Sequence, residues 1–347
     1  MPSDRCILVL GGAGLVGSQI VREIARELEP ARIVVASLYR GEVREFLHDA
    51  RREFCNVEFI GAWGDVFVRD EFMEENRRRL MQTRVRRDAL YQDLFGGLDE
   101  AYERSGLAQL IRQYKPDVIV DCINSATAIS YQDIESLSKQ THDLLDQLNQ
   151  IVDHQDLAAL SNLGRDLEQN VSSLLISQSL PQLIRHVQII HRAMSDSGTR
   201  LYLKIGTTGT GGMGLNIPYT HSEDRPSFKL MSKAAVAFAH TGLMFLMART
   251  PNGPLVKELK PGAMIGYRRV AFKTVKLRGR PMFRYQSQEQ PLVDRLLLRG
   301  DENSYERLDK LQMAGVDTGE NGFFARGEFE TITHTDQMEF ITPEEIA

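Results

Sequence analysis

The sequence predicts an α/β fold: a doubly wound parallel sheet with helical insertions and a smaller C-terminal lobe. Short apolar runs alternate with helical stretches over the first 266 residues, and a glycine-rich turn joins the first run to the first helix. Strands that alternate with helices form parallel sheets, because each crossover helix packs back onto a face of the sheet. After residue 272 the periodicity weakens, which predicts a lobe of different construction.

Six apolar runs account for the predicted sheet. Each is short, rich in β-branched or aromatic residues, and followed by polar residues or glycine, as is typical of buried parallel strands. The stretches that contain them are 6–10, 31–37, 56–66, 115–126, 200–212 and 253–266. We therefore expect six strands in one sheet.

Two helical stretches are longer than a simple crossover requires. Residues 67–114 and 131–178 are polar, poor in proline and mostly helical in pattern, so we expect insertions that pack on the sheet or on a second subunit. In the second stretch, residues at helical spacing form one apolar stripe; they are Leu144, Leu148, Ile151 and Val152. The predicted organisation is a sheet domain of residues 1–272 and a lobe of residues 273–347.

The last residues carry a helix-start pattern. Thr342 is a candidate N-cap, Pro343 occupies the first helical position, and Glu345 follows three residues after the cap. We expect either that the chain is a fragment of a longer polypeptide or that this last turn docks on another surface.

The composition gives no reason to expect a polyanionic partner. The 347 residues carry a formal net charge of −5, so neither nucleic acid nor a membrane surface is expected to bind. An arginine-rich run at residues 77–87 has acidic flanks and no interleaved aromatic residues, and it is predicted to be a solvated or subunit-facing helix surface. No run approaches the length of a signal-peptide core or a membrane span.

The three cysteines lie far apart in the sequence. They predict neither a disulfide framework nor a zinc site, so no metal is expected. A reducing cytoplasm is the expected location.

Four glycines lie at the junction of the first strand and the first helix, and three of them fit the pattern GxxGxxG. Glycines here allow a tight turn, let a pyrophosphate lie against backbone N–H groups at the helix N-terminus, and let helix and strand pack closely. The pattern predicts a dinucleotide-binding turn in a Rossmann-like fold. The residues expected at the pyrophosphate are Gly11, Gly12, Gly14, Leu15, Val16 and Gly17.

The end of the second strand indicates which dinucleotide binds. An acidic residue there would accept a hydrogen bond from a ribose 2′-hydroxyl and favour NAD, but this chain has Ser37. Arg40 lies just beyond and is expected to pair with a 2′-phosphate, whereas Arg44 is expected to face water. NADP is therefore the expected cofactor, with NAD as the alternative.

Several segments, in order along residues 6–266, resemble the extended short-chain dehydrogenase/reductase superfamily, which includes NAD(P)-dependent epimerases, dehydratases and reductases. They are GGAGLVG at 11–17, GDV at 64–66, PDVIVDCINSA at 116–126, the helix and strand at 186–209, NIPYTHSED at 216–224, SKAAVAFAHTGLMFL at 232–246 and LKPGAMIG at 259–266. The resemblance implies that Asp65 and Val66 contact the adenine and that Asn124 and Ser125 line the cofactor.

The same resemblance implies catalytic residues and shows one departure. In that family a tyrosine four residues before a lysine transfers a proton, while a serine or threonine orients the substrate oxygen. Lys233 matches the lysine, which also contacts the cofactor, and Thr208 or its neighbour Thr207 matches the serine or threonine. Lys229 occupies the tyrosine position, so the YxxxK signature is absent.

Three side chains are candidates to replace the missing phenol. Tyr219 is preferred because its loop follows directly from the strand that ends near Thr208, where open α/β sheets bind ligands. His221 and Lys229 are the alternatives. The glycine and threonine loop at 206–214 is expected either to surround an anionic group of the substrate or to act as a lid.

The predicted function is that of an NAD(P)-dependent oxidoreductase or an epimerase/dehydratase-like enzyme. Its substrate is expected to be a polar metabolite, phosphorylated or nucleotide-linked, that reacts at a hydroxyl or carbonyl carbon on the side of the C-terminal lobe. The alternative is a catalytically divergent NAD(P)-binding protein with a scaffold or redox-sensing role. We expect a homo-oligomer, since the helices between residues 131 and 194 carry an apolar stripe.

Overall fold

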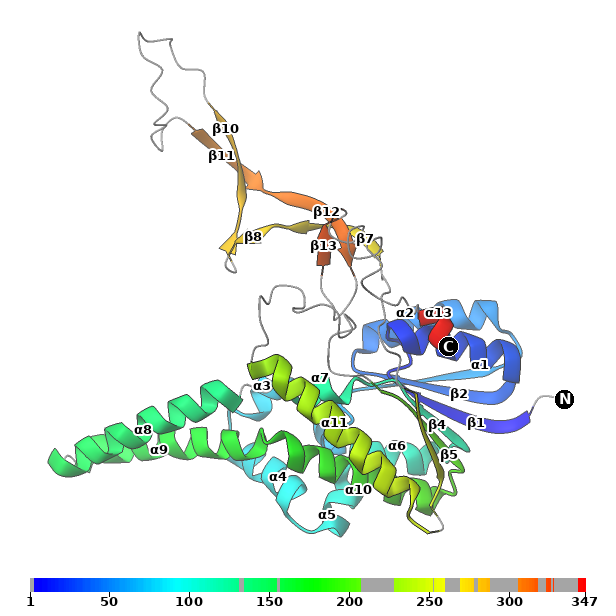
Figure 1. The fold of residues 1–347 in the computed structure, drawn as a ribbon, viewed down its shortest axis with the longest axis horizontal. Helices are drawn as coiled ribbons and strands as arrows, with labels where there is room; N and C mark the ends of the chain where they lie inside the picture. Colours follow the sequence, from blue (N-terminus) through cyan, green and yellow to red (C-terminus); the bar gives the residue numbers. More distant parts are fainter. Residues whose placement is uncertain are drawn as a thin grey trace, which may run out of the picture. The chain divides into compact units, whose positions relative to one another are not determined.

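The computed structural model describes residues 3–130, 134–154, 157–206, 228–251, 253–259, 269–277, 280–287, 305–317, 323–325, 327 and 343–347. The chain divides into two compact units, which are described separately below (Figure 1). The first comprises residues 1–265 and 339–347, and the second comprises residues 266–338.

A six-stranded parallel sheet forms the centre of the first unit. Its order is β3-β2-β1-β4-β5-β6, the order of Rossmann dinucleotide-binding sheets. The strands are β1 (Ser3–Leu10), β2 (Pro30–Ser37), β3 (Glu58–Trp63), β4 (Val118–Asp121), β5 (Leu201–Ile205) and β6 (Leu255–Leu259). Each of the six predicted apolar stretches overlaps one of these strands, so the predicted fold class is confirmed.

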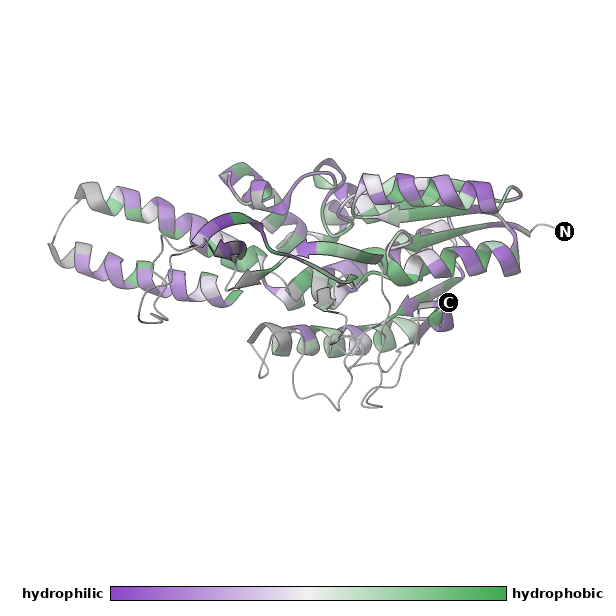
Figure 2. Ribbon diagram, turned by 90° about the horizontal axis from the view of Figure 1, so that it is seen from above, coloured by the Kyte–Doolittle hydropathy of each residue, from purple (hydrophilic) through white to green (hydrophobic). Residues whose placement is uncertain are grey.

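Helices cover both faces of this sheet, and alternate residues of β1 show the two layers. Ile7 and Val9 pack with α1 (Leu15–Leu28) and α2 (Arg40–Glu53). Leu8 and Leu10 pack with α6 (Gly106–Tyr114), α10 (Ser179–Ser197) and α11 (Phe228–Ala248). Figure 2 shows the central strands largely in green, as expected for strands buried on both faces.

Both long insertions are helical. The first contains η1 (Asp70–Phe72), α3 (Arg77–Leu80), α4 (Arg84–Phe95), α5 (Leu98–Arg104) and α6. After α7 (Ser125–Ser130), helices α8 (Ile134–His154) and α9 (Leu157–Ile176) lie side by side as a hairpin (Figure 1). Asn170 of α9 fastens the hairpin by donating to the Leu137 carbonyl and to Oγ1 of Thr141, both on α8.

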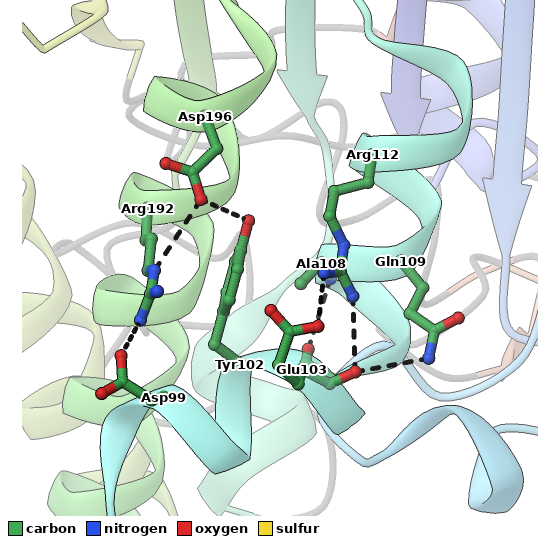
Figure 3. A network of polar contacts seen from close by, with 9 residues as sticks. Asp99, Tyr102, Glu103, Ala108, Gln109, Arg112, Arg192 and Asp196 are labelled. Carbon is green, nitrogen blue, oxygen red and sulfur yellow. Dashed lines mark hydrogen bonds and ion pairs between the residues drawn. The ribbon is translucent and has the colours of Figure 1, made fainter.

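A polar network attaches the first insertion to α10 (Figure 3). The hydroxyl of Tyr102 on α5 donates to Oδ2 of Asp196 at 2.8 Å. The guanidinium groups of Arg112 and Arg192 lie over the Tyr102 ring, 5.1 and 4.4 Å from its centroid. Burial and the bond to Asp196 raise the pKa of Tyr102 to about 12, so this phenol stays protonated and structural.

The arginine-rich run is not wholly a solvated or subunit-facing surface, so that prediction is wrong for Arg87. Arg87 is only 3% exposed; it pairs with Glu168 of α9 at 2.8 Å and donates to the Met81 carbonyl. Arg77 is also half-buried and pairs with Asp65. The insertion helices place these guanidinium groups against other elements, where their hydrogen bonds are made within the protein.

Helix α11 also departs from expectation. The sequence predicts no run of membrane-spanning length, yet residues Met231–Ala248 form a helical window with a mean hydropathy of 1.3, long and apolar enough to cross a membrane. A third of that window, 33%, is buried in the structure. Among the exposed residues are Phe238 and Phe245, two helical turns apart, at 69% and 58% exposure.

The second unit is smaller, as the fold prediction expects, and its strands pair antiparallel. It pairs the strands as β13-β12-β7, β10-β11 and β8-β9. The strands are β7 (Arg269–Thr274), β8 (Lys276–Leu277), β9 (Arg280–Pro281), β10 (Phe283–Ser287), β11 (Tyr305–Lys310), β12 (Gln312–Asp317) and β13 (Phe323–Ala325). Arg284 and Asp309 join β10 to β11 through two hydrogen bonds.

The last helix, α13 (Pro343–Ile346), belongs to the first unit. It begins at the predicted proline. Ile346 is buried in the apolar cluster that includes Ile7 and Val120 of the sheet. The last turn of the chain thus packs on the sheet domain.

Candidate functional site

The glycine turn after β1 is shaped so that side chains are excluded from it. Gly11 has a φ of 73°, which favours glycine, and its carbonyl accepts a hydrogen bond from the N–H of Gly14 at 2.9 Å. Gly14 is the N-cap of α1. A Cβ on Gly17 would lie 2.2 Å from the Gly11 carbonyl oxygen, so only glycine lets the helix approach the turn this closely.

This turn suits an anionic ligand. Helix α1 has no acidic residue in its first turn and no side-chain cap, so N–H groups at its N-terminus can face a pyrophosphate. Gly12 donates to the carbonyl of Ala36 at 3.0 Å, which ties the turn to β2. The predicted residues from Gly11 to Gly17 thus form one backbone cradle that fits a dinucleotide.

The ends of β2 and β3 lie beside each other next to this cradle. Ser37 accepts a hydrogen bond through its carbonyl from the N–H of Gly64 at 3.0 Å. The guanidinium of Arg40 lies 4.7 Å from the centroid of the Trp63 ring, and both Arg40 and Arg44 are exposed on α2. Ser37 therefore ends β2 and Arg40 begins α2 at this edge of the sheet.

Asp65 is held by its own loop and by an arginine. Its Oδ1 accepts from the N–H of Phe67 at 2.9 Å, and its Oδ2 lies 3.4 Å from Nη1 of Arg77. Val66 is buried in the core beneath. Asp65 lies just after the end of β3, and no local signal in the sequence pairs it with Arg77, which lies in the inserted helices.

A cavity of about 50 Å³ lies beside Val66 and is lined partly by arginines. Arg69 makes two hydrogen bonds of 2.7 Å to Asp93, and Arg185 donates to the carbonyls of Leu94 and Gly96 at the end of α4. Through these hydrogen bonds, both guanidinium groups hold the first insertion in place.

The loop after β4 packs directly on the glycine turn. A Cβ on Gly11 would lie 3.1 Å from the Cys122 carbonyl carbon and 3.2 Å from the Ile123 nitrogen. The N–H of Cys122 donates to the Leu10 carbonyl at 2.8 Å. Asn124 and Ser125 follow, so the predicted cofactor residues of this loop lie at the strand end next to the predicted pyrophosphate site.

The predicted catalytic residues are only partly placed. Thr207, Thr208, Tyr219 and His221 lie outside the described residues. Lys233 is buried on α11, four residues after Lys229 in the first turn of that helix. Helix α11 packs on α7, which begins at Ser125, through an apolar cluster of Val236, Ala237 and Ile129. Lys233 and Ser125 therefore belong to two helices that pack together.

A buried charged cluster that was not predicted from the sequence lies beneath this strand edge. Asp121 of β4 and Lys204 of β5 are register partners; Lys204 Nζ lies 3.0 Å from Asp121 Oδ1. The Tyr202 hydroxyl donates to Asp121 Oδ2 at 2.6 Å. A signal was available, because both charged residues interrupt apolar runs that predict buried strands.

The cluster keeps fixed protonation states. Burial alone would raise the pKa of Asp121, but the Lys204 ammonium and the Tyr202 hydroxyl hold it below its usual 3.8. Burial and the adjacent Asp121 carboxylate raise the pKa of Tyr202 well above 10. Burial lowers the pKa of His186, on α10, to about 4. Tyr202 is thus unsuited to replace the missing catalytic phenol.

A family model described as the Beta-methylindole-3-pyruvate reductase C-terminal domain matches residues 284–347. None of the curated proteins compared with the chain matches it. Similar solved structures include the Bordetella bronchiseptica enzyme WbmG in complex with NAD and UDP, which is 13% identical with a TM-score of 0.36. The alignment covers 76% of this chain and 54% of WbmG, so the chain spans about half of that enzyme's length.

Two further structures have similar values. UDP-glucose-4-epimerase from Stenotrophomonas maltophila, with bound NAD and formylated UDP-arabinopyranose, is 12% identical with a TM-score of 0.38, covering 76% of this chain and 54% of the epimerase. A short-chain dehydrogenase/reductase from Serratia marcescens is 14% identical with a TM-score of 0.36, covering 76% of both chains. Of these, the Serratia marcescens protein is named for the superfamily that the sequence motifs resemble.

Proposed function

We propose that the chain is an NAD(P)-dependent enzyme of the short-chain dehydrogenase/reductase type, acting on a hydroxyl or carbonyl carbon of a polar metabolite. The observation that carries this proposal is the backbone cradle at the end of β1, where the Gly11 carbonyl leaves no room for a Cβ on Gly17. Such a cradle at the N-terminus of a helix fits a pyrophosphate. A bound nicotinamide supplies hydride transfer.

Each predicted residue has a place in this proposal. The glycine turn holds the pyrophosphate, Ser37 and Arg40 the adenosine ribose, and Asp65 and Val66 the adenine. Asn124, Ser125 and Lys233 lie toward the nicotinamide. Thr208 orients the substrate oxygen and Tyr219 transfers the proton.

The proposed substrate is an anionic metabolite with a reactive hydroxyl or carbonyl group. Two classes are to be tested. One is an aryl 2-oxo acid, because residues 284–347 match the C-terminal domain of a methylindole pyruvate reductase, and the other is a nucleotide sugar, because the similar epimerase binds one. The purified protein is titrated with NADPH and NADH, and the absorbance of the reduced cofactor is then followed with each class of substrate. Failure to bind either dinucleotide would disprove the proposal.

The second candidate function is cofactor binding without hydride chemistry, in a scaffold or redox sensor. The observation that favours it is Lys229 at the position of the family's tyrosine. The Lys233→Met variant distinguishes these two functions. An enzyme would lose its turnover. A protein that only binds the cofactor would still bind the dinucleotide, with a modestly lower affinity.

Arg40→Ala is expected to weaken NADPH binding by about 1 to 3 kcal/mol, the contribution of a charge-assisted hydrogen bond, and to leave NADH binding unchanged. Calorimetric titration with both dinucleotides measures this. Arg44→Ala, at an exposed position one turn further along α2, is the matched control and should alter neither affinity. Equal affinities of the unmodified protein for NADPH and NADH would contradict the proposed preference.

We also propose that the protein forms a homo-oligomer in the cytoplasm. Self-association is supported by exposed apolar side chains on neighbouring helices, Leu180 and Ile184 on α10 and Phe238 on α11. We expect Ile184→Glu combined with Phe238→Glu to convert the oligomer to a 39.3 kDa monomer in sedimentation velocity. Leu145→Glu, on the exposed side of α8, is the control. A monomeric unmodified protein would disprove self-association.

A further inference from the structure

We infer that Lys204 is a positioning residue for the cofactor: its buried ammonium fixes the loop of residues 122–125 against the glycine turn. This inference rests on the proposed function, because it assigns a purpose to that loop. It concerns a residue that no sequence motif singles out.

Each of the three N–H groups of the Lys204 ammonium has a partner. Lys204 is 2% exposed and lies on β5, one residue before its end. Its Nζ donates to the Ile123 carbonyl at 2.6 Å, to Oγ of Ser125 at 3.2 Å, and pairs with Oδ1 of Asp121 at 3.0 Å. An ammonium has three donors, so a single side chain from β5 holds three points on β4 and the loop after it.

The same contacts reach the glycine turn. Oδ1 of Asp121 also accepts from the N–H of Ile123 at 2.9 Å, so the first peptide groups of the loop are held on both sides. The Cys122–Ile123 peptide is the backbone that lies against Gly11. Lys204 therefore links the carboxyl ends of β5, β4 and β1.

Strand stability alone does not account for this arrangement. Desolvating two charges is costly, and apolar residues of similar volume often replace buried ion pairs without loss of stability. Here, however, the loop carries a carbonyl and a hydroxyl at the strand edge where a ligand must approach. Lys204 satisfies both from within the sheet, so neither group needs a partner from the ligand.

The test uses the double variant Lys204→Met with Asp121→Asn, which removes both charges and leaves no unpaired buried ion. Lys257→Met, at an exposed position on the neighbouring strand β6, is the control. Binding of NADPH is compared with binding of 2′,5′-ADP, which lacks the nicotinamide half and does not extend to Asn124 and Ser125. We expect the Kd of NADPH to rise at least about tenfold in the double variant and the Kd of 2′,5′-ADP to change less than about twofold.

A purely structural role for Lys204 would weaken both ligands equally or neither, and either result overturns the inference. Hydrogen exchange of the Ile123 and Ser125 amides, measured without ligand, tests the clamp independently of binding. We expect faster exchange at these amides in the double variant and unchanged exchange in β1 and β2. Unchanged loop exchange would disprove the clamp itself, whereas failure of the unmodified protein to bind NADPH would disprove the proposed function.

Discussion

Gly17→Ala is expected to raise the Kd for both NADPH and NADH by roughly 100-fold, equivalent to about 2.7 kcal/mol. The added methyl group would lie 2.2 Å from the Gly11 carbonyl oxygen and 2.8 Å from its carbonyl carbon. These are backbone atoms, so a rotamer change cannot relieve the clash. Helix α1 must move away from the turn, and its N–H groups then no longer face the pyrophosphate.

The matched control for this change is Gly41→Ala. Gly41 lies in the first turn of α2, and a Cβ there would meet nothing within 4 Å. Alanine has the higher helix propensity, so this variant should be neutral or stabilised by up to about 1 kcal/mol. Isothermal titration measures the affinities and thermal unfolding measures the stabilities. An unchanged Kd in Gly17→Ala would remove the glycine turn from the cofactor site.

The sheet and the position of the candidate site were predictable because their signals are local. A strand buried on both faces must be a short continuous apolar run, as in residues 31–37, and a turn that excludes side chains must contain glycine, as at Gly17. Parallel strands present their carboxyl ends at one edge of the sheet. The sequence therefore predicts both the fold and the edge at which ligands would bind.

The polar contacts within the fold were not predictable in the same way. Arg77 pairs with Asp65 across 12 residues, Arg87 with Glu168 across 81, and Lys204 reaches the Ile123 carbonyl across 81. Such pairs depend on how inserted helices and strands pack, which single-sequence periodicity does not contain. An arginine in a charged run is predicted to be solvent-exposed unless the helix or strand that covers it is known. A charged residue inside an apolar run, such as Lys204, was the one local signal.

Stability is expected to fall by about 2 to 3 kcal/mol between about pH 7.5 and pH 4.5 because His186 is buried in its neutral form. The side chain is 6% exposed, and its ring lies 4.6 Å from that of Phe67 and 6.5 Å from that of His240. Its Nε2 has no hydrogen-bond partner among the residues that the structure describes. Burial lowers the pKa of His186 to about 4, with Asp121 favouring the charged form and Lys204 opposing it.

The direction of this pH dependence follows from whether the folded or the unfolded chain binds the proton more tightly. The unfolded chain protonates this histidine near pH 6.5, whereas the folded protein does so only near pH 4, so falling pH favours unfolding throughout that interval. Protonation of Asp121 also destabilises the folded state, but only at lower pH, because the pKa of Asp121 in the folded protein is held below 3.8. Among the described residues, His186 is the group whose pKa shift falls in this interval, so we expect it to account for the loss there.

Urea unfolding of the His186→Leu variant at the two pH values tests this assignment. Leucine suits the apolar surroundings and cannot titrate, so the variant should lose at least about 2 kcal/mol less stability than the unmodified protein over the same interval. His48→Leu, at an exposed position on α2, is the control and should retain the full pH dependence. If His186→Leu loses as much stability as the unmodified protein, the acid sensitivity has another origin. A flat profile in His186→Leu alone shows that burying one neutral imidazole beneath the strand edge makes this fold sensitive to mild acid.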